Sequence, residues 1–106
     1  MKISEILRAG KVNIEKFGWC QGDELAIHGP DSGPCCAATA LTRVPITWAW
    51  DGKFPGNEAI NLLKQAAGVS TAISIATWND APERTLAEVL AAYDKAIVAA
   101  EAQELT

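Results

Sequence analysis

Apolar side chains recur at helical spacing along most of the chain, and the pattern is clearest at its two ends. At the start, apolar positions predict a helix over residues 2–17, which Gly18 would end. At the other end, Thr85 and Glu88 form a capping box. The apolar residues that follow would share one face of a helix from Leu86 to about Gln103. They are Leu86, Val89, Leu90, Tyr93, Ile97 and Ala100.

Between these ends the sequence predicts a short helix of small side chains. Pro34 suits the first helical position, with Ser32 or Gly33 as the cap. The helix would continue through Leu41, and its small side chains would let other helices approach closely. We therefore expect it to be the buried central helix.

The remaining segments are less regular. Asn57 is expected to cap a helix that ends at Gly68. Residues 70–77 are too short for periodicity to separate helix from strand, and the helical neighbours favour a short helix that ends at Trp78-Asn79-Asp80. Residues 44–56 fit either a tryptophan-containing loop or a short hairpin.

These elements together predict an all-α fold. We expect a compact bundle of four to five helices, with the loop or hairpin around residues 44–56 packed on it. The 106 residues correspond to a single domain, residues 1–106, and 49% apolar residues are enough to fill a core.

Charge and hydropathy narrow the classes of function. A net charge of -4 and a pI near 4.8 argue against nucleic-acid binding, which needs a basic face. Lys and Arg are scattered, and no apolar run approaches the roughly 20 residues of a membrane span. The N-terminus lacks the apolar segment of a secretory signal, so a cytoplasmic protein is expected.

Cys36 is the first candidate for catalysis. A thiol in the first turn of a helix lies near the positive end of the helix dipole, which favours a reactive thiolate. His28, the only histidine, would be the base, and Asn79 or Asp80 would orient it. The alternative is structural, because cysteine is among the residues most often buried.

The sequence predicts neither a metal nor a cofactor. A site can be drawn from Cys20, His28 and either Cys35 or Cys36, but it lacks the close ligand pairs of zinc sites. The odd number of cysteines favours reduced thiols.

Tryptophans are the candidate binding residues, because aromatic side chains concentrate at protein interfaces. The 4 tryptophans are Trp19, Trp48, Trp50 and Trp78. A second interpretation makes Trp78-Asn79-Asp80 a turn that shapes the backbone between two helices. The chain would be a monomer or a homodimer, the latter paired through Ala91, Ala92, Ala96 and Ala99.

Four segments resemble, in order, the motifs of an uncharacterised family of small proteins found in actinobacteria and phages. Its members typically show Gly-Trp-x-Gln-Gly, Cys-Ala-x-Gly-Ala-Leu, Trp-Asn-Asp and Arg-Thr-x-x-Glu-Val-Leu. The counterparts here begin at Gly18, Cys36, Trp78 and Arg84, and Thr39 replaces the usual second-motif glycine. The resemblance implies one helical domain and transfers no activity.

Our hypothesis is a small acidic protein that acts by binding a protein partner, in one version a phage- or mobile-element-encoded host-interaction factor. The alternative is a small enzyme or ligand-binding domain, with its site between Cys36 and Asn79 or Asp80.

Overall fold

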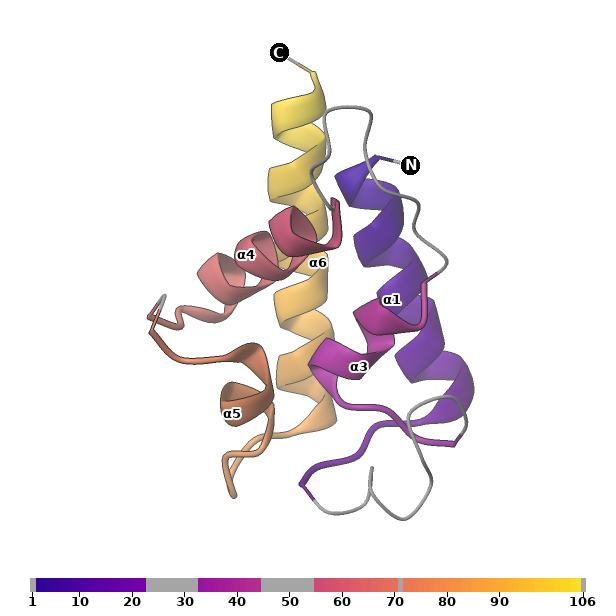
Figure 1. Ribbon diagram of the computed structural model, residues 1–106, viewed down its shortest axis with the longest axis vertical. Coiled ribbons are helices and arrows are strands. Elements are labelled where there is room, and N and C mark those ends of the chain that lie inside the picture. The colour runs from indigo at the N-terminus through magenta and orange to yellow at the C-terminus, as the bar shows by residue number, and fades with distance from the viewer. Residues whose placement is uncertain (1, 23–32, 45–54, 71, 106) are drawn as a thin grey trace.

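Two long antiparallel helices, α1 (Ile3–Phe17) and α6 (Leu86–Glu104), lie side by side and form the frame of the fold (Figure 1). The structure is a computed structural model, and it describes residues 2–22, 33–44, 55–70 and 72–105. Both chain termini lie at one end of this pair, and α5 (Ile75–Asn79) lies toward the other end.

The first predicted helix is confirmed as α1, which ends at Gly18 with φ 95°. Its apolar residues Ile6, Leu7 and Ile14 are buried, whereas Val12 and Phe17 are exposed. Gly10 lies where α1 meets two other elements. A Cβ atom there would stand 2.8 Å from Leu41 Cδ2 and 3.0 Å from Tyr93 Cε1. The glycine therefore allows the close approach of a neighbouring helix and a buried aromatic ring.

The predicted helix of small side chains exists, but it is shorter and starts later than predicted. It is α3 (Ala37–Thr42), and its N-cap is Cys36 rather than Ser32 or Gly33. Cys35 is instead extended and forms a parallel bridge with Trp19. That pairing holds the preceding residues out of the helix. As expected, most of α3 is buried, and it packs on α1, α4 (Pro55–Ala67) and α5.

Two further helices complete the fold, one packed on α1, α3 and α6 and the other packed on α3 and on the first of the two. The first, α4 (Pro55–Ala67), begins before Asn57, so the prediction that Asn57 caps it is wrong. The chain leaves it at Gly68, as predicted, with φ 75°. The predicted short helix is α5 (Ile75–Asn79), which begins at an N-cap from Ser74 and contains Trp78 and Asn79 within its last turn.

The predicted final helix is confirmed with its cap. Thr85 Oγ1 accepts a hydrogen bond from Glu88 N at 3.2 Å, and Thr85 N donates to Glu88 Oε1 at 3.1 Å. Leu86, expected on the inner face, is 42% exposed. The alanine face proposed for a dimer is divided: Ala92 and Ala96 are buried in the core, whereas Ala91 and Ala99 are exposed.

The all-α prediction is confirmed, since the described residues form five α-helices and their β structure is limited to one isolated bridge. Tyr93 occupies the centre of the core and donates its hydroxyl hydrogen to Ala37 O at 2.6 Å. The loop or hairpin predicted for residues 44–56 falls almost entirely outside the described residues. No helix in the described part of the chain is long and apolar enough to cross a membrane.

Candidate functional site

The side chain of Asn79 joins three parts of the chain at the end of α5, which we call the Asn79 junction. Its Oδ1 accepts hydrogen bonds from Trp19 Nε1 at 2.7 Å and from Ala37 N at 3.0 Å. Its Nδ2 donates to Cys20 O at 3.0 Å and to Asp80 Oδ1 at 3.1 Å. Asn79 is fully buried, and both lone pairs of Oδ1 and both hydrogens of Nδ2 form hydrogen bonds.

The side-chain amide of Asn79 extends a short parallel ladder of backbone hydrogen bonds between residues 18–20 and Cys35. Cys35 N donates to Gly18 O at 2.9 Å, and Cys20 N donates to Cys35 O at 3.2 Å. In a regular parallel ladder the next bond would run from Ala37 N to Cys20 O. Asn79 stands between these two groups and bonds to each of them. Its side chain thus takes the place of the missing backbone rung.

The neighbours of Asn79 close the same corner. Gln21 Nε2 donates to Asn79 O and to Ala81 O, both at 2.8 Å. Because the last carbonyls of a helix lack internal partners, Gln21 caps the end of α5. Asp80 is exposed, and its Oδ1 also accepts a hydrogen bond from Gly22 N at 2.9 Å. The polar groups of this corner therefore bond to one another.

Cys36 lies beside the Asn79 junction, and its thiol caps the N-terminus of α3. Its Sγ accepts a hydrogen bond from Thr39 N at 3.4 Å and lies 3.2 Å from Thr39 Oγ1. The prediction that it lies in the first turn of a helix is wrong, because Cys36 is the cap itself and is 7% exposed. His28, the predicted base, lies outside the described residues.

Cys35 and Cys20 are also buried. Burial raises the pKa of the Cys35 thiol, which is opposite to what a thiolate nucleophile needs. In the described ranges, no three His, Cys, Asp or Glu side chains gather closely enough to hold a metal ion. Among the described residues, burial of the thiols therefore disfavours a cysteine nucleophile.

Two of the four predicted binding tryptophans, Trp19 and Trp78, lie among the described residues. Trp19 is half-buried against the core, and its indole N–H is used in the Asn79 junction. Trp78 is also half-buried, with the Arg84 guanidinium 4.2 Å from the centroid of its ring. Trp48 and Trp50 lie outside the described residues.

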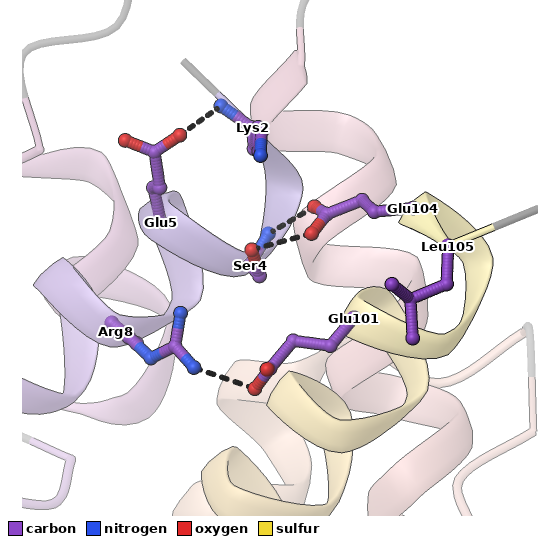
Figure 2. Close-up of a pocket in the computed structure, with 7 residues that line it drawn as sticks. All are labelled: Lys2, Ser4, Glu5, Arg8, Glu101, Glu104 and Leu105. Atoms are coloured by element: carbon purple, nitrogen blue, oxygen red, sulfur yellow. Dashed lines mark hydrogen bonds and ion pairs between the residues drawn. The ribbon is translucent and has the colours of Figure 1, made fainter.

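A polar cleft of about 300 Å³ lies between the start of α1 and the end of α6 (Figure 2). Ser4 N and Oγ donate to the Glu104 carboxylate at 3.0 and 2.7 Å, and Arg8 pairs with Glu101 at 2.6 Å. The two bonds from Ser4 lower the pKa of Glu104, helped by the nearby charges of Lys2 and Arg8. The Glu101 and Glu104 carboxylates in this cleft therefore already bond to groups of α1.

A more apolar surface lies where α4 meets α6, and we call it the α4–α6 groove. It consists of two hollows, of about 260 and 210 Å³, which share Ala66 and Lys95 and so adjoin each other. The first is also lined by Ala67, Trp78, Arg84, Glu88, Ala91 and Ala92, and the second by Leu62, Gln65 and Ala99.

Of the predicted binding residues, only Trp78 lines this groove among those that the structure describes. Lys95 and the small residues of α4 were not among the predicted binding residues, because nothing local in the sequence shows which faces of α4 and α6 meet.

Comparison with known proteins identifies the family. No curated protein and no solved structure matches the chain. One family model matches residues 1–99, which is nearly the whole chain, and it is described as a family of unknown function, DUF6197. This description agrees with the expected resemblance to an uncharacterised family. The chain belongs to the family of unknown function DUF6197.

Proposed function

We propose that the protein acts by binding another protein, which lies in the α4–α6 groove. The observation that carries this proposal is the groove itself, a hollowed and largely apolar surface beside a half-buried tryptophan. Apolar concave surfaces rimmed by polar side chains are typical of sites where proteins bind one another.

The other two candidate surfaces support this choice by contrast. At the Asn79 junction the Asn79 side chain bonds four groups of the protein itself, and in the polar cleft the carboxylates bond to groups of α1. A ligand at either place would have to replace bonds that already exist. Contact with Ala66, Ala91 and Ala99 in the groove would displace only water.

One version of the proposal places the gene in a phage or mobile element, where a small acidic protein would act on a host protein. The genes that neighbour it test this version separately from the binding site.

Site-specific photocrosslinking in cells that carry the gene tests the proposal. A benzophenone amino acid would replace Gln65, at the groove, or Val12, an exposed residue of α1 that lines neither hollow. We expect the Gln65 position, and not the Val12 position, to form an adduct with a particular protein. Mass spectrometry would identify that protein, which would then be purified.

Calorimetry with the purified partner gives the decisive measurement. Ala99→Arg fills the second hollow, whereas Ala102→Arg changes an exposed position of α6 that lines neither hollow. Arginine is a good helix former, so both variants should fold. We expect Ala99→Arg to weaken binding at least about tenfold, and Ala102→Arg to leave it unchanged. Identical adducts from both positions, or equal affinity for both variants, would refute the proposal.

A further inference from the structure

The α4–α6 groove has one unbalanced charge at its centre. Lys95 lines both hollows, is exposed, and forms no ion pair or hydrogen bond with any described residue. The nearby Arg84 is different, because its Nη1 pairs with Glu88 at 2.9 Å and its guanidinium stacks on Trp78. The groove thus presents a net positive charge on a chain whose net charge is -4.

The walls of the groove select the shape of an occupant. Both walls are α-helices, whose backbone groups are bonded along each helix, so they offer no free edge to an extended peptide. An α-helix satisfies its own backbone, and the small Ala66, Ala91 and Ala99 would let it approach closely. From Glu88 to Ala99 the groove follows α6 for about 16 Å, or about three helical turns.

We infer that the partner contributes an amphipathic α-helix, whose apolar face fills the two hollows and whose carboxylate pairs with Lys95. This inference rests on the proposed function and names the chemistry of the partner. Small apolar side chains on either side of one Asp or Glu would match the two hollows on either side of Lys95. An exposed ion pair adds little affinity, but a wrong charge opposite it is strongly disfavoured. Lys95 therefore acts mainly to select the partner.

Selection from defined libraries tests the inference on the full chain. One library displays a helix with a randomised face on a three-helix scaffold, and the other displays randomised extended peptides. Each library is selected against the wild-type protein and against Lys95→Glu. We expect helical binders with Asp or Glu at one position for the wild type, and Lys or Arg at that position for Lys95→Glu. Each binder should lose at least about tenfold in affinity when the charge at position 95 is reversed.

Each outcome separates the inference from the proposed function. Groove-dependent binders from the extended library alone, or helical binders with no acidic position, would overturn the inference and leave groove binding standing. Binders that ignore Ala99→Arg, or no binders from either library, would contradict both. A dimer of the purified chain that dissociates on Ala99→Arg would show that a second copy occupies the groove, which also overturns the inference.

Discussion

At the scale of single residues, Asn79 has the largest structural role that the sequence left open. It links α5 to segments 60 and 42 residues earlier in the chain, through Trp19 Nε1 and Ala37 N. Its neighbours in the sequence, Trp78 and Asp80, face different surroundings: one stacks with Arg84 and the other lies at the exposed edge of the junction. The three residues of this motif therefore have three separate structural roles.

Asn79→Ala should strongly destabilise the protein. The change removes the side chain that bonds to Trp19 Nε1, Ala37 N and Cys20 O, and each buried polar group left unsatisfied costs about 1–3 kcal/mol. We expect the free energy of unfolding to fall by at least about 3 kcal/mol, measured by urea denaturation. Asn61→Ala, at an exposed position of α4, is the matched control and should change it by less than about 0.5 kcal/mol. Similar values for the two variants would show that the junction is not a stabilising hub.

At the scale of helices, the caps follow local rules and the contacts between helices do not. Thr85 and Glu88 begin α6 as their spacing predicts, and the bonds from Thr85 and Arg84 lower the pKa of the Glu88 carboxylate. The cap predicted for α3 from the same rules is wrong, because backbone pairing of Cys35 with Gly18 and Cys20 competes with helix formation.

The polar contacts between α1 and α6 form an antiparallel series. Along α1 the residues are Ser4, Arg8 and Lys11, and their partners on α6 are Glu104, Glu101 and Asp94 in turn. The hydrogen bond to Asp94 raises the pKa of Lys11, and the bonds from Ser4 lower the pKa of Glu104. Each shift means that the charged form is favoured in the folded state.

Glu104→Gln should remove a pH-dependent part of this helix pairing. Because the pKa of Glu104 is lower in the folded protein than in the unfolded chain, its contribution is present above the unfolded value of about 4.3. The contribution disappears as the pH falls through the lower folded pKa. We expect the urea midpoint of Glu104→Gln to lie below that of the wild type at about pH 7, and the difference to shrink toward about pH 3.

The control for this prediction is Glu83→Gln, at an exposed residue of the turn before α6. Its difference from the wild type should vary less with pH over the same range. A difference for Glu104→Gln that stays constant over this range would contradict a role for its charge. Direct titration of the Glu104 carboxylate by NMR should give a pKa below about 4.3.

At the scale of the whole molecule, the helices enclose all the cysteines. The exposed fractions of Cys20, Cys35 and Cys36 are 2%, 0% and 7%. Tyr93 is enclosed in the same core, and burial raises its pKa well above the ordinary value. A reagent can reach these side chains only when the structure opens.

Alkylation of the thiols by iodoacetamide should therefore be slow in the native protein. Opening that costs about 3 kcal/mol would slow the reaction about a hundredfold relative to the chain in guanidinium. Ser70→Cys adds a thiol at an exposed position and serves as the reactive control. Mass spectrometry would assign each site. If native Cys36 reacts as fast as the thiol added at position 70, the enzyme interpretation would gain support.

The sequence by itself determined the all-α class, the bounds of α1 and α6 to within a few residues, and the cap at Thr85. The physical reason is that helical periodicity, caps and glycine stops depend on residues a few positions apart. The resemblance to an uncharacterised family agrees with the family of unknown function whose model matches residues 1–99.

Only the tertiary structure decided what surrounds Asn79 and Lys95. Asn79 completes a ladder between segments distant in the sequence, and Lys95 faces a groove that exists only because α4 lies across α6 (Figure 1). Such roles depend on which faces of separate elements meet. That is settled by packing of the whole core, so a local pattern shows that a residue is polar without showing what it contacts.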